Sequence, residues 1–269
     1  MAEAGAARPY WHLLRAQARG QASYRMSFAL DLVSNVFMLG ADLLAVLVLF
    51  RVTPALGGFG LTEVFLMFGL SCSAFALADL AVGNIERMRV YVRTGQLDAF
   101  LVRPLRVLPQ LLVNDVGMRR IGRVLYGFGV LGVAAGYARI SWTPARAALL
   151  VVAPISGAVL FSAIFVAAAT VAFWWIESGE LANTLTYGGR DFTAYPMTVY
   201  SGWFRRAFAY GVGLAFVAYY PALALLGKPD PLGLPTGIGW AAPLVAAGAA
   251  GVAAVVWRIG LRQYRSTGS

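Results

Sequence analysis

The stretch that decides the fold is AALLVVAPISGAVLFSAIFVAAATVAFWW, residues 147–175. It holds no charged side chain, and it exceeds the ~20 apolar residues that a helix needs to cross a bilayer. Five further stretches are long and mostly apolar, at about 27–50, 63–85, 121–138, 207–226 and 237–257. The apolar runs are continuous rather than alternating, so the sequence predicts an all-α membrane protein with six transmembrane helices and not a β-barrel.

The composition of the whole chain supports this fold class. Of its 269 residues, 59% are hydrophobic and 13% are charged, and the mean hydropathy is +0.69. Soluble proteins carry about 25% charged residues, which they need to cover an apolar core. No linker or internal repeat divides the chain. We therefore predict a single transmembrane domain over residues 1–269.

The net charge of +10 comes from lysines and arginines that lie between the apolar runs. With six spans, all but four of the 22 fall on one side of the membrane, which the positive-inside rule identifies as the cytoplasm. We therefore predict a multi-pass protein of a bacterial inner membrane with both termini in the cytoplasm. The pattern favours membrane lipid as the partner and argues against nucleic acid. The four exceptions are Arg51, Arg139, Arg146 and Lys228.

Two segments outside the spans have distinct compositions. Residues 9–26 mix tryptophan, tyrosine and leucine with regularly spaced arginines, which predicts an amphipathic helix lying at the cytoplasmic interface. Residues 86–120 form the longest polar stretch and lie on the cytoplasmic side. Loops of this length are usually functional, so we expect this loop to have a function.

Polar residues inside the spans are the candidates for an intramembrane site. Asp31, Asn35 and Asp42 fall on one stripe of the first span, and Asp79 and Glu86 share one face of the second. Ionisable groups in a bilayer are costly, so each needs a partner or a function. Two interpretations stay open: the stripes contact polar groups of other helices, or they line a path for protons or substrate.

Residue patterns of catalysis are missing from the sequence. His12 is the only histidine and Cys72 the only cysteine, and no HExxH, GxSxG or GxxxxGK[ST] motif occurs. We therefore expect no metal site, no enzymatic activity and no bound cofactor in this chain. If transport is driven by ATP, a separate polypeptide must hydrolyse it.

The loop at 86–120 contains GQLDAFLVRP, from Gly95 to Pro104, which resembles the G-x-L-D-x-x-L-x-R-P motif of ABC-2 type permeases. The similarity is greatest to an uncharacterised six-span family of that superfamily. The closing RQYRSTG at 262–268 is similar to the family's R-x-Y-x-S-x-G. Further residues that resemble family signatures around the fifth span are Tyr195, Pro196, Tyr200, Trp203, Tyr219, Tyr220 and Pro221.

The resemblance implies the architecture of a type-2 ABC exporter. In such permeases this loop carries a coupling helix that docks on a nucleotide-binding ATPase subunit, present in two copies that bind the ATP and magnesium. A second permease, identical or related, completes the pathway, and the cargo is amphiphilic or lipid-like, a drug or a peptide. The residues implied in coupling are Gly95, Leu97, Asp98, Phe100, Leu101, Arg103 and Pro104.

The residues of this motif suit a short docking helix. Gly95 ends the helix that extends from the second span, and Pro104 stops the next one. Between them Leu97, Phe100 and Leu101 are spaced i, i+3 and i+4, which predicts one apolar face for a groove on the partner. The alternative is a helix on the membrane surface with no protein partner.

Three other functions fit parts of the sequence. An ion-driven secondary transporter would bring Asp31, Asp42 and Asp79 together at the middle of the bilayer. An intramembrane enzyme acting on lipids would need a polar catalytic cluster, which the sequence does not show. A non-transporting membrane scaffold would use the loop at 86–120 to bind a partner but enclose no path.

Overall fold

The computed structural model of the chain describes residues 25–113, 119–175 and 178–264. In the first helix, side chains are described at positions 33 and 37 and from position 40 onward. The predicted interfacial helix at 9–26 lies almost entirely outside these residues. Their secondary structure is helical throughout, apart from an isolated bridge between Leu56 and Phe59. The all-α prediction is therefore confirmed for the described part of the chain.

The helices follow one another with short connections. The α-helices are α2 (Arg25–Val52), α3 (Leu61–Val82), α4 (Met88–Arg93), α5 (Gln96–Leu101), α6 (Val107–Val113), α7 (Arg119–Tyr137), α8 (Pro144–Thr170), α9 (Gly179–Thr193), α10 (Gly202–Arg205), α11 (Tyr219–Leu226) and α12 (Ala242–Gln263). The 3-10 turns are η1 (Gly83–Arg87), η2 (Val171–Phe173), η4 (Met197–Val199), η6 (Leu214–Phe216) and η7 (Thr236–Ala241), and η5 (Arg206–Gly211) is a π-helix.

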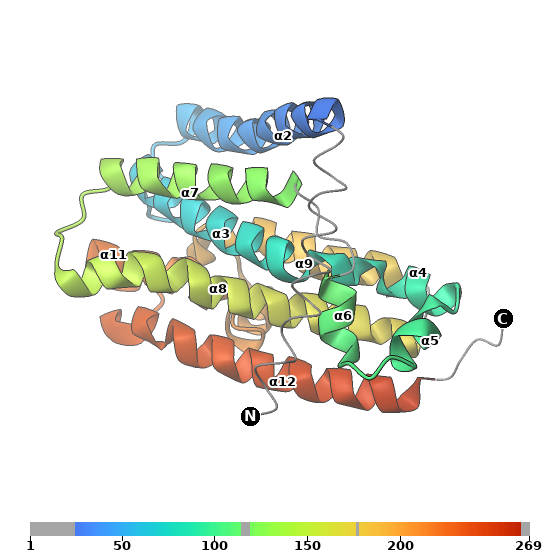
Figure 1. Ribbon diagram of the computed structural model, residues 1–269. Helices are drawn as coiled ribbons and strands as arrows, with labels where there is room; N and C mark the ends of the chain where they lie inside the picture. The colour runs from blue at the N-terminus through green and yellow to red at the C-terminus, as the bar shows by residue number, and fades with distance from the viewer. Residues whose placement is uncertain (1–24, 114–118, 176–177, 265–269) are drawn as a thin grey trace.

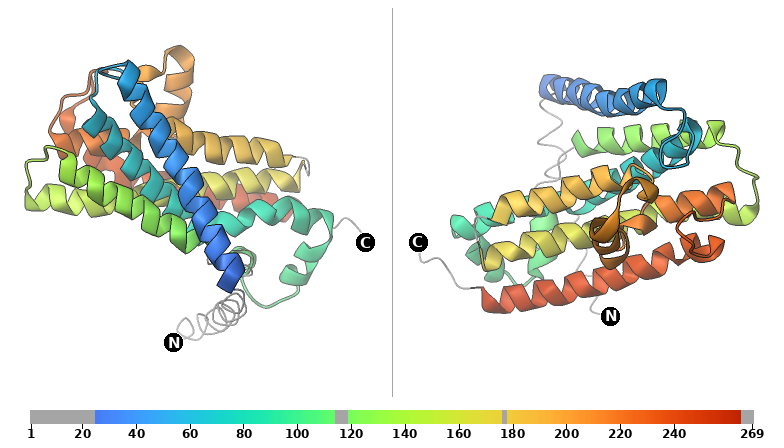
Figure 2. Two further views of the ribbon diagram at one scale, coloured as in Figure 1. Left: turned by 90° about the horizontal axis from the view of Figure 1, so that it is seen from above. Right: turned by 180° about the vertical axis from the view of Figure 1, so that it is seen from behind.

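The long helices form a bundle in which neighbours run roughly parallel or antiparallel (Figure 1). α8 packs against both α12 and α3, and α3 packs against α7. α2 crosses the outside of the bundle and contacts mainly α7 (Figure 2). The short helices α4, α5 and α6 gather at one end, where α2 begins and α12 ends (Figure 1). This is the α4–α6 end, and the opposite one is the α11 end.

Glycines allow α3 and α7 to pack at close range. A Cβ atom on Gly127 would lie 3.0 Å from the Cα of Ser73, and one on Gly69 would lie 2.9 Å from the Cα of Leu131. Neither position could accept a side chain without moving backbone. Small residues at such contacts are typical of membrane helices, whose association depends on close packing rather than on the hydrophobic effect.

Three helical segments of the described chain are long and apolar enough to cross a membrane: Leu61–Arg93, Pro144–Phe173 and Gly237–Gln263. They coincide with the predicted second, fourth and sixth spans. The predicted first and third spans are occupied by α2, with 28 residues, and α7, with 19. The exact number of six crossings stays a prediction.

The predicted fifth span at 207–226 is broken in the structure rather than continuous. Helical segments Gly202–Gly211 and Leu214–Leu226 are bent by 62° relative to each other and count as a span only if they are taken together. Gly213 lies between them with a φ of 86°, in the left-handed region that favours glycine and ends a helical run. The sequence shows apolar length here but not this local reversal.

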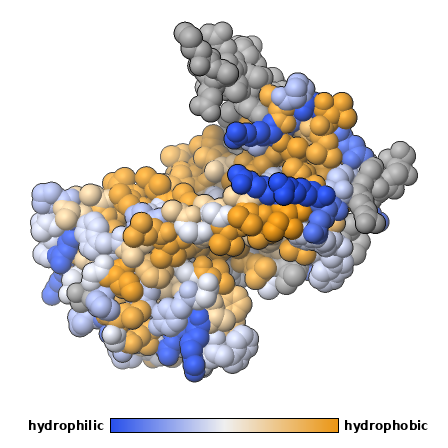
Figure 3. Space-filling view, turned by 90° about the horizontal axis from the view of Figure 1, so that it is seen from below, coloured by the Kyte–Doolittle hydropathy of each residue, from blue (hydrophilic) through white to orange (hydrophobic). Residues whose placement is uncertain are grey.

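Helix α9 occupies a region that the sequence assigned to a cytoplasmic loop. It begins near the end of α8, at the α4–α6 end, and returns alongside α8 and α3 toward the middle of the bundle (Figure 2). α9 contains many polar residues and no long apolar run, so it was not predicted as a span. The outer surface of the bundle is otherwise largely hydrophobic between its two ends on the face shown in Figure 3.

Candidate functional site

The predicted short helix between Gly95 and Pro104 is present. Gly95 adopts a φ of 69°, in the left-handed region, and thereby separates α4 from α5. α5 then runs for six residues and ends at Leu101, before the proline. Asp98 lies in its first turn, where a negative charge complements the helix dipole. The local signals of the motif therefore produced the expected backbone.

The predicted docking face of α5 is wrong for two of its three residues. Leu97 is 0% and Phe100 7% exposed, so both side chains are buried inside this chain. The Phe100 ring packs edge-on against Tyr91, with centroids 5.7 Å apart. Gln110 of α6 donates a hydrogen bond from Nε2 to the Phe100 carbonyl oxygen, at 3.2 Å. A six-residue helix has little stability alone, so its apolar face is used to anchor it to α4 and α6.

The exposed apolar surface of this region comes just after α5. Leu101 is 41% and Val102 85% exposed, and Arg103, Pro104 and Arg106 around them are also exposed. The guanidinium of Arg103 lies over the Phe100 ring, at 5.5 Å from its centroid. Residues 101–106 are called the tip below. The tip thus presents two apolar side chains bordered by arginines.

A hydrogen bond joins α5 to the segment after α12. The Tyr264 hydroxyl donates to Oδ1 of Asp98 at 3.1 Å. The same ring packs edge-on against Phe173 of η2, at 5.7 Å between centroids. Burial and this hydrogen bond raise the pKa of the Tyr264 phenol further above neutral pH. Asp98 and Tyr264 belong to two separate sequence motifs, and only the folded chain shows that they touch.

Asp79 of α3 is paired with two arginines of α7. Its carboxylate, 2% exposed, forms an ion pair with Nε of Arg120 at 3.2 Å and accepts a hydrogen bond from Arg123 at 2.8 Å. Gly83 makes room for this pairing, because a Cβ there would lie 2.2 Å from the Asp79 carboxylate. For Asp79 the structural interpretation therefore holds: it joins two helices through a compensated charge.

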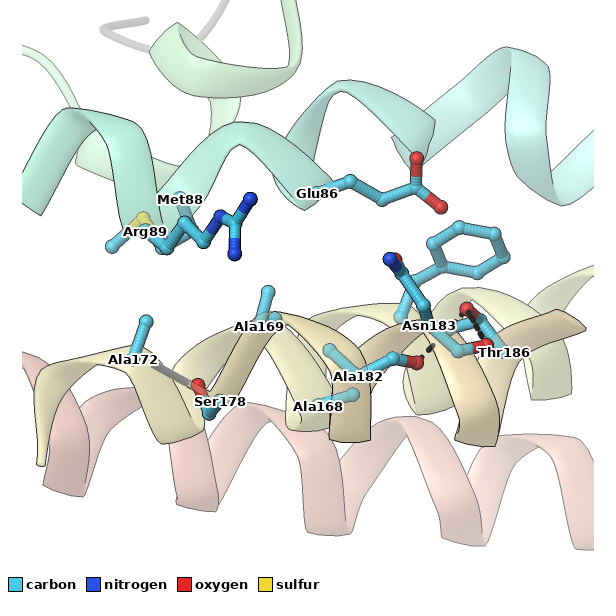
Figure 4. Close-up of a pocket in the computed structure, with 12 residues that line it drawn as sticks. Glu86, Met88, Arg89, Ala168, Ala169, Ala172, Ser178, Ala182, Asn183 and Thr186 are labelled. Atoms are coloured by element: carbon cyan, nitrogen blue, oxygen red, sulfur yellow. Dashed lines mark hydrogen bonds between the residues drawn. The ribbon is translucent and has the colours of Figure 1, made fainter. Parts of the chain in front are cut away.

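Glu86 of η1 faces α9 across a small cavity. The Tyr187 hydroxyl donates to its Oε2 at 3.4 Å, whereas its Oε1 is buried with no hydrogen-bond partner among the described residues. Figure 4 shows Glu86 and Arg89 above Asn183 and Thr186, which line the cavity together. Its volume of about 20 Å³ is room for about one water molecule. A water there would satisfy the free oxygen.

Asp42 of α2 is paired with Arg190 of α9, at 2.5 Å between the Asp42 Oδ2 and an Arg190 terminal nitrogen. The Arg190 guanidinium also lies over the Phe75 ring, at 5.8 Å from its centroid. Ser71, in the middle of α3, donates to the Arg190 carbonyl oxygen at 3.2 Å. Placing Arg190 in the cytoplasmic loop was therefore wrong, because it lies at the middle of the bundle.

The three intramembrane candidates whose side chains are described, Asp42, Asp79 and Glu86, do not all meet at one site. Asp42 and Asp79 each contact their own arginines, and Glu86 contacts Tyr187. The side chains of Asp31 and Asn35 lie outside the described residues. In the described part of the chain, no group of three or more histidine, cysteine or acidic residues could hold a metal ion.

The tyrosines and prolines that resemble family signatures shape the segment between α9 and α12. Tyr200 stacks on Phe192 with centroids 4.2 Å apart, and Tyr195 packs against the core. Tyr219 donates to Asp230 at 2.7 Å, and the neighbouring Tyr220 is 1% exposed. The two prolines lie where a proline is tolerated: Pro196 precedes η4, and Pro221 lies in the first turn of α11.

The chain matches a known protein family over most of its length. Residues 36–268 match the family described as "ABC-2 family transporter protein". The match extends from within α2 to beyond α12 and so includes the tip, α9 and the bent segment. No curated protein and no solved structure matches the chain significantly.

Proposed function

Because the chain belongs to the ABC-2 transporter family, we propose that it is the permease subunit of an ATP-driven exporter. It forms half of a transmembrane pathway, together with a second permease that is identical or related. Two copies of a separate ATPase subunit bind ATP and magnesium and power the pathway. The chain itself is not an enzyme. It resides in a bacterial inner membrane with both termini in the cytoplasm.

The observation that carries the proposal is the tip at residues 101–106. Val102 is 85% exposed at an end of the bundle where arginines are concentrated. An apolar side chain exposed beside Leu101, with arginines around it, has the composition of a protein-binding patch. The tip replaces the buried residues Leu97 and Phe100 as the surface that an ATPase subunit would contact.

The anchoring of α5 supports a role in transmitting force. Phe100 fixes it to α4 and α6, and Asp98 fixes it to Tyr264 at the ends of α8 and α12. A displacement of the tip therefore acts on several membrane-length helices at once. An unanchored loop would absorb the displacement instead.

The ion-driven alternative receives less support from the polar residues. A transporter that binds protons or sodium ions needs carboxylates able to release and recapture a cation. Asp42 and Asp79 are each compensated by arginine instead. An ATPase partner supplies the energy without requiring such a site.

The proposal is tested by placing a charge on the tip with Val102→Asp. We expect the amount of ATPase subunit that copurifies with the membrane-extracted chain to fall by roughly tenfold or more, because burying an unpaired carboxylate costs more than the ~1.4 kcal/mol of a tenfold change. The matched control is Val52→Asp. Val52 is 80% exposed and is the last residue of α2, at the end of that helix far from the tip (Figure 1). Equal losses for both variants, or no ATPase with the native chain, contradict the proposal.

A further inference from the structure

Helix α9 has an exposed face that is polar among its described side chains. The exposed residues recur at helical spacing, and none of those described is aliphatic. The opposite face is buried against α3 and α8, with Gly189, Phe192 and Thr193 among its residues. The exposed residues, called the polar stripe below, are Glu180, Asn183, Thr184, Tyr187, Gly188 and Asp191.

Two contacts fix the depth of the stripe. The Arg190 carbonyl accepts from Ser71 in the middle of α3, and a Cβ on Gly189 would lie 3.6 Å from Phe161 in the middle of α8. A helix rises about 1.5 Å per residue, so about ten residues reach from the middle of a ~30 Å hydrocarbon core to its surface. Most of the stripe therefore lies within the thickness of the bilayer.

A polar face at this depth cannot be surrounded by lipid. The hydroxyls of Thr184 and Tyr187 already donate within the chain, to the Glu180 carbonyl oxygen and to Glu86. Hydrocarbon offers no hydrogen-bond partner to the carboxylates of Glu180 and Asp191 or to the Asn183 amide, so exposing these groups to it is costly. Polar residues inside membranes accordingly face a water-filled cavity or another protein chain. The stripe begins at the α4–α6 end and reaches the middle of the bundle, which is the course of a path that opens at that end.

The stripe is acidic in a chain of net charge +10. Glu180 and Asp191 contribute two carboxylates, and the adjacent Arg190 is compensated by Asp42, which is itself 46% exposed. Arg89 lies beside Gly179 at the start of the helix, so the five charges leave the stripe net negative. A negative wall at low dielectric concentrates cations and repels anions.

The inner end of the stripe adjoins an aromatic cluster. Phe192 follows Asp191 directly and stacks on Tyr200 at 4.2 Å between centroids. Phe204 packs on Phe192 at 5.6 Å, and Trp203, in edge contact with Phe204, is 73% exposed. Aromatic faces beside carboxylates are the chemistry that binds ammonium groups, and their surface also accepts an apolar body.

We propose that the polar stripe and this aromatic cluster form the cargo site, and that the cargo is a cationic amphiphile carrying an amine or quaternary ammonium group. The proposal rests on the exporter function above and concerns what the pathway accepts. Beyond the arginines of the α4–α6 end, the carboxylates of the stripe attract the ammonium group. The aromatic cluster then holds the apolar part at the middle of the bundle.

The test uses cysteine reactivity and needs no knowledge of the natural cargo. Cys72 is the only cysteine in the sequence, so Cys72→Ser gives a background without a thiol. Thr184→Cys on the stripe is compared with Val255→Cys on α12, which is exposed at a similar depth on the apolar surface. The probes are two membrane-impermeant methanethiosulfonates, one carrying trimethylammonium and one carrying sulfonate, applied to the full-length protein in lipid nanodiscs.

We expect Thr184→Cys to react and Val255→Cys to stay unmodified. After correction for reactivity with a free thiol, the ammonium reagent should react with Thr184→Cys roughly tenfold faster than the sulfonate reagent. Adding Asp191→Asn and Glu180→Gln should abolish this preference. As a control, Glu63→Gln removes one carboxylate at the α11 end, where it pairs with Lys228, and keeps a side chain able to cap α3. It should leave the preference unchanged.

Two results overturn the proposal. An unreactive Thr184→Cys means that a second copy of the chain or lipid covers the stripe, and equal rates for the two reagents mean that the path does not select cations. Both results are independent of whether the tip binds an ATPase. A failure of the cargo site is therefore distinguishable from a failure of the exporter function, which the Val102→Asp variant reports.

Discussion

Helices α9 and α12 both expose one face on the surface of the same bundle, but the two faces differ in chemistry. α12 exposes aliphatic side chains, among them Leu244 at 76%, Val252 at 64% and Val255 at 53%. α9 exposes the polar stripe at a comparable depth. Exposure in the isolated chain therefore has two meanings in this protein: α12 is suited to lipid and α9 to water or a polar partner. Depth and polarity together separate the two.

The largest effect should come from exchanging the character of the two faces. Val255→Asp places a carboxylate on the lipid-facing side of α12, which costs about 2.5–3.5 kcal/mol for a central position in a membrane helix. Thr184→Asp places the same group on the polar stripe, where we expect little loss. Two quantities are measured for each variant: the fraction integrated in the membrane, and the fraction that remains folded after heating in nanodiscs. If the two variants lose integration equally, the contrast between the faces is wrong.

A smaller effect should follow from removing the ion pair that borders the stripe. Arg190→Met leaves Asp42 without its partner in the middle of the bundle. Since Asp42 is 46% exposed, we expect a loss of about 1–2 kcal/mol, less than for a fully buried pair.

Asp42→Asn in the same chain should recover most of that loss, because the unpaired charge is then gone. Thermal unfolding of the single and double variants in nanodiscs measures the coupling between the two residues. A double variant as unstable as Arg190→Met alone contradicts the assignment of the loss to the unpaired Asp42.

The smallest effect on stability should come from Tyr264→Phe, at the end of α12. The variant loses the hydrogen bond to Asp98, worth about 0.5–1.5 kcal/mol, and keeps the ring contact with Phe173. If α12 takes part in coupling through this contact, transport per ATP hydrolysed should fall although the chain remains folded.

The matched control for this measurement is Tyr137→Phe. Tyr137 is 72% exposed at the end of α7, toward the α11 end, and its substitution should change neither stability nor coupling. A normal ratio of transport to ATP hydrolysis in Tyr264→Phe contradicts the role of the contact.

Predictions that depend on one segment of the sequence were confirmed more often than predictions that depend on contacts between distant segments. The second, fourth and sixth spans coincide with membrane-length helices, because apolar length is a property of one segment. The boundary of α5 at Gly95 was predictable for the same reason, since a glycine in the left-handed region acts on its own neighbours. α9 was missed because its exposed face is polar, although the spacing of Asn183, Tyr187 and Asp191 is a helical signal that the sequence contains.

Contacts between distant segments could not be predicted from the spacing of residues in the sequence. The spacing of Leu97 and Phe100 shows that these side chains share a face, but not whether that face meets a partner or the chain's own α4 and α6. The pairing of Asp42 with Arg190 joins residues far apart in sequence, and nothing near either of them specifies the other.

By itself the sequence determined that the protein is a helical membrane protein of the ABC-2 type, because hydropathy and the motif at Gly95–Pro104 are read along one segment at a time. Only the tertiary structure decided which surfaces are free. It turned Phe100 inward, left Val102 exposed, bent the fifth predicted span at Gly213 and placed α9 alongside α3 and α8. The physical reason is that a side chain is buried or exposed depending on which helix packs beside it, and that helix comes from a distant part of the chain.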